Sequence, residues 1–241
     1  MGTEITVDKT SAYLALPDDV GPCLILIHEV WGLNAHIRDV ADRFAAEGYV
    51  VLAPDLLSKT GIPDKVSPEL MRRADDPATR DEAQKEMRAA MAPMQSPEFA
   101  AETLETLKGC YEFLRQHEAT TGIVAVIGFC FGGTYAFALA AEEPDLACAI
   151  PFYGHSEGIM EKLDQILAPI LAFYGEQDTA LVSTLPDLEE AMAEHDVEFS
   201  YVAYEGTGHA FFNDTNPSTY NEAAAKDSWN KSLAFLSEHT S

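Results

Sequence analysis

The hexapeptide Gly128-Phe129-Cys130-Phe131-Gly132-Gly133 constrains the fold of this chain more than any other segment. Apolar, β-branched residues 122–127 precede it, and residues 134–142, rich in Ala and Leu, follow it. This pattern predicts a strand, a sharp turn and a helix. The flanking glycines let the strand and the helix pass close together. We therefore expect Cys130 to sit in a strained turn at a helix amino terminus, where the helix dipole favours a thiolate or a developing oxyanion.

The rest of the chain alternates between predicted strands and predicted helices. We expect strands at 13–16, 23–28, 49–53, 122–127, 148–153, 170–174 and 198–204, and helices at 34–47, 97–116, 134–142, 186–195 and 218–237. Residues 56–97 break this rhythm with Pro63, Pro68, Pro77, Pro93 and Pro97 between charged helical pieces, and they predict an excursion over one edge of the sheet. The alternation indicates an α/β fold, a mostly parallel central sheet with helices on both faces, in a single domain over residues 1–241. Functional sites in such sheets lie at the carboxyl ends of the strands.

The charge balance excludes some partners. The chain has 40 Asp and Glu against 15 Lys and Arg, for a net charge of −25. This excess argues against nucleic acid or an anionic membrane as a partner. Because the acids are spread over predicted helices, they indicate a solvated acidic surface or, alternatively, adaptation to high salt. The chain lacks an apolar run of 18 residues, and residues 1–16 do not resemble a signal peptide, so we expect no membrane span and a cytoplasmic location.

The four cysteines are at positions 23, 110, 130 and 148. Their spacing contains no CxxC pair and no zinc-binding pattern, so we expect free thiols and no metal site. Cys23 and Cys148 lie in apolar strand-like runs and Cys110 in a helical pattern, which is typical of inert packing. Cys130 is therefore the candidate nucleophile.

A cysteine nucleophile requires a base, and the base requires an orienting group. His209 lies in the glycine-lined loop 205–211, directly after the last predicted strand, and Asp178 follows the strand at 170–174. The order Cys130, Asp178, His209 is the nucleophile–acid–histidine order of α/β-hydrolases. The sequence therefore predicts a triad of these three residues.

A fourth part of the site is predicted in His28-Glu29-Val30-Trp31-Gly32-Leu33-Asn34, which follows the strand at 23–28. In this architecture the loop after that strand supplies one oxyanion donor, and the residue after the nucleophile supplies the other. We expect these donors to be the backbone N–H groups of Val30 and Phe131. Glu29 is expected to face the site beside the thiol of Cys130.

These motifs, together with Pro54-Asp55-Leu56, Gly175-Glu176-Gln177-Asp178 and Gly208-His209-Ala210-Phe211, closely resemble those of the dienelactone hydrolase family over about residues 10 to 236. The resemblance implies an α/β-hydrolase fold, a monomer, no cofactor and the triad Cys130, Asp178 and His209. It also implies that Glu29 holds the resting thiol protonated until substrate displaces the glutamate and releases the thiolate.

The chain departs from the family in its substrate contacts. Family members that hydrolyse dienelactone hold its carboxylate with two arginines, one of them four residues after the catalytic histidine, where this chain has Asn213. Arg88, in the excursion, is a possible match for the other arginine. Losing one bidentate clamp weakens the binding of an anionic substrate. An apolar pocket is predicted from Trp31, Phe129, Phe131, Tyr153, Phe211 and Phe212.

Taken together, the sequence predicts an enzyme that cleaves an activated ester or an enol-lactone, with no nucleic acid, membrane or cofactor involved. A carboxylesterase or thioesterase of another pathway is one alternative. A redox-sensing protein with an oxidisable Cys130 is another, although no resolving cysteine lies nearby in the sequence. A non-catalytic binding module on a hydrolase fold is the third.

Overall fold

The computed structural model describes residues 1–76 and 78–241, so Pro77 of the predicted excursion lies outside the described residues. In the described chain, eight strands form one sheet in the order β1-β2-β4-β3-β5-β6-β7-β8. The strands are β1 (Thr3–Val7), β2 (Thr10–Ala15), β3 (Gly21–Ile27), β4 (Val50–Pro54), β5 (Thr120–Phe129), β6 (Ala149–Phe152), β7 (Ile170–Gly175) and β8 (Phe199–Tyr204). Pairing is antiparallel from β1 through β2 to β4 and parallel from β4 to β8. The mostly parallel sheet predicted from the sequence is confirmed.

The first strand was not predicted. β1 has the sequence Thr-Glu-Ile-Thr-Val, of which only Val7 is buried, and it lies at one edge of the sheet. Because most of its side chains are exposed, β1 lacks the apolar run by which the other strands are recognised.

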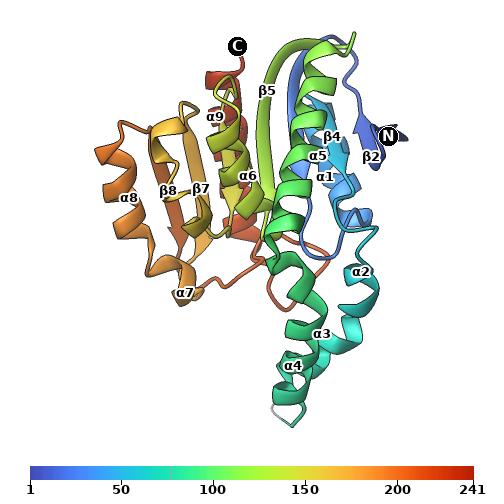
Figure 1. Ribbon diagram of the computed structural model, residues 1–241, viewed down its shortest axis with the longest axis vertical. Coiled ribbons are helices and arrows are strands. Elements are labelled where there is room, and N and C mark those ends of the chain that lie inside the picture. Colours follow the sequence, from blue (N-terminus) through green and yellow to red (C-terminus); the bar gives the residue numbers. More distant parts are fainter. Residues whose placement is uncertain (77) are drawn as a thin grey trace.

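Helices cover both faces of the sheet, as Figure 1 shows. α1 (Ala35–Ala46) and α9 (Glu222–His239) lie on one face, where the rings of Phe44 and Trp229 are 4.2 Å apart. α5 (Pro97–Gln116) and α6 (Phe131–Glu142) lie on the other, and α8 (Leu185–Glu194) connects β7 to β8. Asn34 caps α1, because its side chain accepts a hydrogen bond from the Ile37 N–H.

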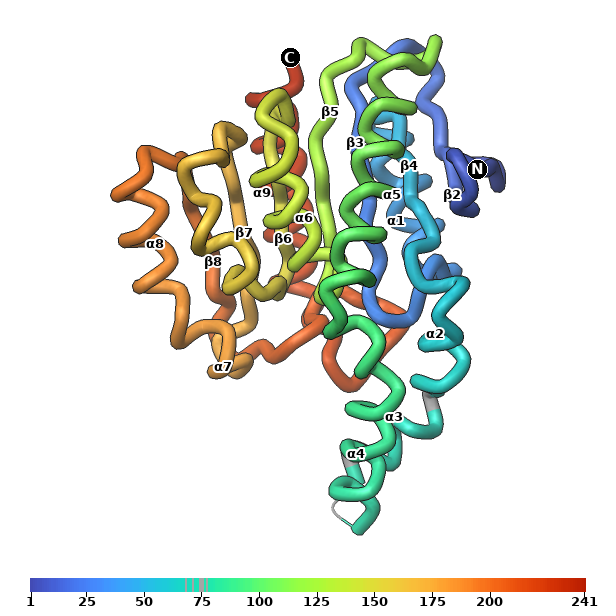
Figure 2. Tube along the Cα trace, viewed as in Figure 1, coloured from blue at the N-terminus to red at the C-terminus, as the bar shows by residue number. Residues whose placement is uncertain are grey.

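The excursion forms a helical projection. α2 (Ile62–Lys65), α3 (Pro68–Asp75), α4 (Arg80–Met91) and a 3₁₀ turn at Ala92–Gln95 lie between β4 and α5. In Figure 2 this segment extends from the body of the protein, with α3 beside α4, past the edge where the parallel strands end. Among the described residues, none of the helices has both the length and the apolar character needed to cross a membrane.

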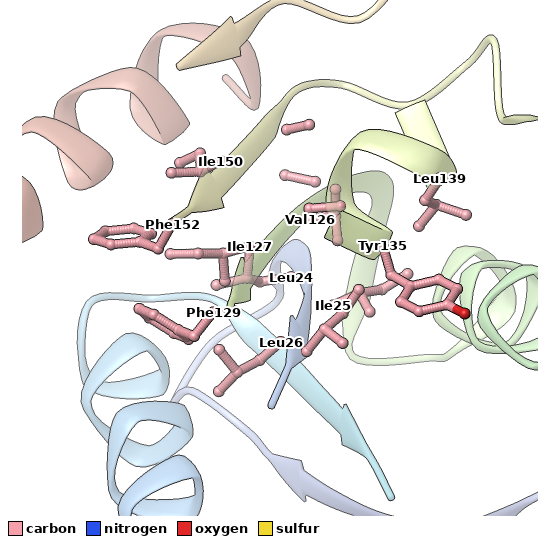
Figure 3. Packing of buried hydrophobic residues seen from close by; sticks show 14 of the residues in the cluster. Leu24, Ile25, Leu26, Val126, Ile127, Phe129, Tyr135, Leu139, Ile150 and Phe152 are labelled. Atoms are coloured by element: carbon pink, nitrogen blue, oxygen red, sulfur yellow. The ribbon is translucent and has the colours of Figure 1, made fainter. Parts of the chain in front are cut away.

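The core lies between the central strands and the helices that cover them. Figure 3 shows side chains from β3, β5, β6 and α6 packed together, among them Leu24, Ile127, Leu139 and Phe152. Leu24 and Phe152 are fully buried. This packing fixes the carboxyl ends of β3, β5 and β6 relative to one another, and these ends carry the loops of the predicted site.

Candidate active site

Cys130 lies between the end of β5 at Phe129 and the start of α6 at Phe131. Its backbone has φ of 55° and ψ of −110°, a conformation that costs a non-glycine residue free energy. Its N–H donates to the Phe152 carbonyl at 3.0 Å, and its carbonyl accepts from the Thr134 N–H at 3.1 Å. These bonds to β6 and α6 hold the strained turn in place.

Two glycines make the turn sterically possible. A Cβ on Gly128 would lie 2.0 Å from the Gly132 carbonyl oxygen, and a Cβ on Gly132 would lie 2.2 Å from the carbonyl oxygen of Ile27. Both distances are far below van der Waals contact, so only glycine fits at either position. The close approach brings the start of α6 against the end of β3.

His209 and Asp178 meet across two loops. Asp178 follows β7, and His209 lies in the loop after β8. The Nδ1 of His209 is 2.5 Å from Oδ2 of Asp178. Burial by itself lowers the pKa of His209, but the hydrogen bonds to Asp178 and Cys130 outweigh it and raise the pKa to about 10. The ring therefore faces both the predicted orienting acid and the predicted nucleophile.

Cys130 differs from the other cysteines in its exposure. It is half-buried, whereas Cys23, Cys110 and Cys148 are buried free thiols. Burial raises the pKa of Cys110 and of Cys148 to about 12, which makes both thiols inert at neutral pH. The burial of the other thiols also disfavours the alternative in which Cys130 pairs with a resolving cysteine.

Glu29, in the loop after β3, has a partner that the sequence did not reveal. The carboxyl group is almost fully buried, and its Oε2 accepts a hydrogen bond of 2.7 Å from Nδ2 of Asn213. Its Oε1 has no hydrogen-bond partner within the described part of the chain. Burial raises the pKa of Glu29, and the bond from Asn213 partly opposes that shift.

Asn213, predicted as a substrate contact, is hydrogen-bonded within the protein at both ends of its amide. It is 5% exposed, and its amide oxygen accepts from both the N–H and the hydroxyl of Thr215, at 3.1 and 2.6 Å. Both ends of the amide are engaged inside the protein. The amide nitrogen of Asn213 binds Glu29, and its role in substrate binding stays a prediction.

Tyr153 and Phe211 are part of the core. They are 1% and 0% exposed, and the ring of Tyr153 lies 4.9 Å from His209 and 5.6 Å from Phe211. Tyr153 has φ of 40°, a second strained position at a strand end. Burial, followed by the charges of Glu29 and Cys130, raises its pKa well above the ordinary value. The ring of Tyr153 packs against His209, and the ring of Phe211 packs against Tyr153. Phe129 and Phe212 are also buried.

The remaining predicted contacts are more exposed. Trp31 is partly buried against the core in the loop after β3. Arg88 is exposed on α4, a helix that packs against α2, α3 and the 3₁₀ turn. Its role in substrate binding stays a prediction.

The two predicted oxyanion donors come from two segments, the start of α6 and the loop after β3. Phe131 is the first residue of α6, where a backbone N–H has no acceptor within the helix. Val30 is 8% exposed in the loop that follows β3. Within residues 1–76 and 78–241, neither the Val30 N–H nor the Phe131 N–H donates to another group of the protein. In the same described residues, no cluster of His, Cys, Asp or Glu side chains could hold a metal ion.

Known proteins match this arrangement over nearly the whole chain. Residues 10–240 match the family model described as the dienelactone hydrolase family. A carboxymethylenebutenolidase candidate from Saccharolobus solfataricus is 33% identical over 250 residues, covering 95% of this chain and 93% of that protein. The crystal structure of a dienelactone hydrolase candidate from Klebsiella pneumoniae has a TM-score of 0.80 at 26% identity, covering 99% of this chain and 98% of that one. Dienelactone hydrolase from Anabaena variabilis, at 16% identity and a TM-score of 0.71, shares the fold over 100% of this chain and 98% of its own. The chain therefore has the α/β-hydrolase fold and belongs to the dienelactone hydrolase family.

Proposed function

We propose that this carboxylic ester hydrolase cleaves an activated ester or an enol-lactone, with Cys130 as nucleophile, His209 as base and Asp178 as the group that orients the base. The observation that carries the proposal is the 2.5 Å contact between His209 and Asp178, made beside the strained, half-buried Cys130. Acyl transfer through a covalent intermediate needs a nucleophile, a base and an orienting acid that lie within reach of one another.

In the proposed reaction the thiolate of Cys130 attacks the carbonyl carbon, and the N–H groups of Val30 and Phe131 stabilise the oxyanion. The proton of the thiol passes to His209 as the thiolate is released. The carbon–oxygen bond then breaks, and His209 donates this proton to the departing alkoxide or enolate as the thioester forms. His209 takes a proton from water, which attacks the thioester, and passes that proton on so that thiol and acid are released. Asp178 keeps the ring of His209 in the required orientation throughout.

Glu29 is proposed to keep the resting thiol protonated until substrate displaces its carboxyl group. Its burial supports this role, because a carboxyl group that favours its neutral form has a proton to share. Asn213 is the donor that restrains this carboxyl group.

Removal of the Asn213 amide is expected to destabilise the protein in a pH-dependent way. In Asn213→Ala, Glu29 loses the donor that favours its charged form, at a cost of about 1–3 kcal/mol. Since burial raises the pKa of Glu29 above 4.5, folding loses stability as pH rises above that value, and losing the donor enlarges the loss. Urea unfolding at pH 5 and pH 8 should show the larger destabilisation at pH 8. An equal cost at both pH values, or an equal cost in a Glu29→Gln background, would contradict the coupling.

Leaving-group ability is expected to rank the substrates. A thiolate leaves a tetrahedral intermediate more readily than an alkoxide does, so acylation succeeds when the ester's own leaving group is good. We expect kcat/KM to fall from p-nitrophenyl acetate and an enol-lactone to ethyl butyrate by about two orders of magnitude or more, equivalent to roughly 3 kcal/mol in the barrier. Initial rates on the three substrates test this order, with the Cys130→Ala variant as background control. Fastest turnover on ethyl butyrate would overturn it.

A further inference from the structure

His28, which directly follows β3, makes two hydrogen bonds that the proposed chemistry does not use. The side chain is fully buried. Its Nε2 is 3.0 Å from the backbone nitrogen of Leu56, and its Nδ1 is 2.6 Å from the carbonyl oxygen of Glu29. The ring therefore joins the loop after β4 to the loop that carries Val30.

The partners of His28 fix its protonation state. A backbone N–H can only donate, so Nε2 must be the acceptor for Leu56 and carries no proton. A carbonyl can only accept, so Nδ1 must carry the proton that it donates to Glu29. His28 is therefore a neutral ring in a single tautomer. Burial, which lowers the pKa of His28, keeps it neutral.

This donation also orients the next peptide N–H. The carbonyl of Glu29 and the N–H of Val30 belong to the same peptide group, and the described chain has no cis peptide bond. In a trans peptide these two groups point in opposite directions. The Glu29 carbonyl is held by His28 and by the Gly32 N–H at 3.2 Å, so the Val30 N–H is directed away from His28.

His28 also contacts the residue that supplies the other donor. Its ring stacks on the ring of Phe131, with centroids 5.8 Å apart and planes at 15°. A Cβ on Gly132 would lie only 2.9 Å from the carbonyl oxygen of His28, so the start of α6 packs directly on this residue. One buried side chain thus touches both segments that provide the oxyanion donors.

We propose that His28 is a positioning residue that sets the direction of the Val30 N–H and its spacing from the Phe131 N–H, so that both donate to one oxyanion. This inference rests on the proposed acyl transfer at Cys130. His28 itself neither touches the reacting carbonyl nor moves a proton. The role requires a neutral ring, because Nδ1 has to donate to the Glu29 carbonyl while Nε2 accepts from the Leu56 N–H.

Three variants test the role. His28→Leu removes both hydrogen bonds. We expect kcat for p-nitrophenyl acetate to fall by roughly ten to a hundredfold with little change in KM. This fall is smaller than the fall in kcat that follows removal of a whole oxyanion donor. His28→Gln, which keeps an uncharged donor and acceptor, should recover most of that loss. Cys23→Ala is the matched control, because it removes a buried bond to a backbone carbonyl at the opposite end of β3. It should lower the melting temperature without lowering kcat.

Alkylation of Cys130 separates positioning from general damage to the site. Iodoacetamide reacts with the thiolate by displacement of iodide and builds no oxyanion, so its rate should stay within about threefold of wild type in His28→Leu. An unchanged kcat, an equal fall in acylation and alkylation, or no recovery by His28→Gln would overturn the proposal. If instead Cys130→Ala retained full esterase activity, the proposed function itself would fail, and the two failures are thereby distinguished.

The tautomer can be measured in the unmodified protein, so the proposal stays testable even if His28→Leu does not fold. Nitrogen chemical shifts of ¹⁵N-labelled histidine at pH 7 should show one buried ring protonated on Nδ1 only, and this signal should be missing in His28→Gln. A doubly protonated ring, or a proton on Nε2, would overturn the inference.

Discussion

Cys130→Ala is expected to lose ester hydrolysis by a factor on the order of 10⁴ or more, because the covalent route disappears and only binding and oxyanion stabilisation are left. Cys130→Ser should recover little of this activity. A serine hydroxyl is far less acidic than a thiol, so it forms much less of the anionic nucleophile with His209 as base. The loss should therefore be similar for both variants despite the close match in size between thiol and hydroxyl.

Turnover of p-nitrophenyl acetate and mass spectrometry of the quenched enzyme measure this effect. Wild type should carry an acyl group on Cys130 during turnover, and neither variant should. Cys148→Ala is the control, because that thiol is fully buried and its pKa is raised to about 12 by burial. Activity of Cys130→Ala within tenfold of wild type would remove Cys130 from the mechanism.

Much of the fold is predictable because its elements carry local signals. The helix predicted at 97–116 is observed as α5 (Pro97–Gln116), and its start is marked by Ser96, whose side chain accepts from the Phe99 N–H, and by the proline at its first position. Central strands are apolar on both faces, so they stand out without knowledge of their partners. β1 has no such signal, since its stability comes from pairing with β2 at an edge.

The site also has a part that the sequence predicts and a part that it does not. Cys130, Asp178 and His209 each follow a predicted strand, and parallel strands bring their carboxyl ends to one edge, so their proximity follows from the topology. The bond between Asn213 and Glu29 joins residues 184 positions apart and depends on how the loop after β8 turns. Position relative to His209 suggested a substrate contact for Asn213, but a neutral amide can be satisfied by buried neighbours where a guanidinium would need a counter-charge.

His28 shows the limit of motif recognition. The sequence places it at the end of an apolar strand, where it looks like one more residue of the loop motif. Its partners are Leu56, from the loop after the neighbouring β4, and its own following peptide. The one signal in the sequence is that His28 is a polar residue at the end of a buried strand. Such a side chain has to find its hydrogen-bond partners within the protein.

Asp178→Asn is expected to lower kcat by a factor on the order of 10³–10⁴, because an amide can donate to Nδ1 of His209 and stabilise the wrong tautomer. The pKa of His209 should fall from about 10, since the hydrogen bond to Asp178 is the larger of the two that raise it. The raised pKa contributes folding stability that is fully present below pH 6.5 and is lost as pH rises through 10. The stability difference between wild type and variant should therefore shrink as pH approaches and passes 10.

Titration of the His209 ring by NMR and denaturant unfolding from pH 6 to pH 10.5 measure both effects of Asp178→Asn. Glu176→Gln is the matched control, because Glu176 is an exposed acid two positions earlier in the same loop and is subject to solvent screening. It should leave kcat and the His209 titration nearly unchanged. If Glu176→Gln lowered the His209 pKa as much as Asp178→Asn does, general negative charge rather than the 2.5 Å contact would set that pKa. Since the chain carries 40 acidic residues, this comparison separates the orienting contact from the field of the whole protein.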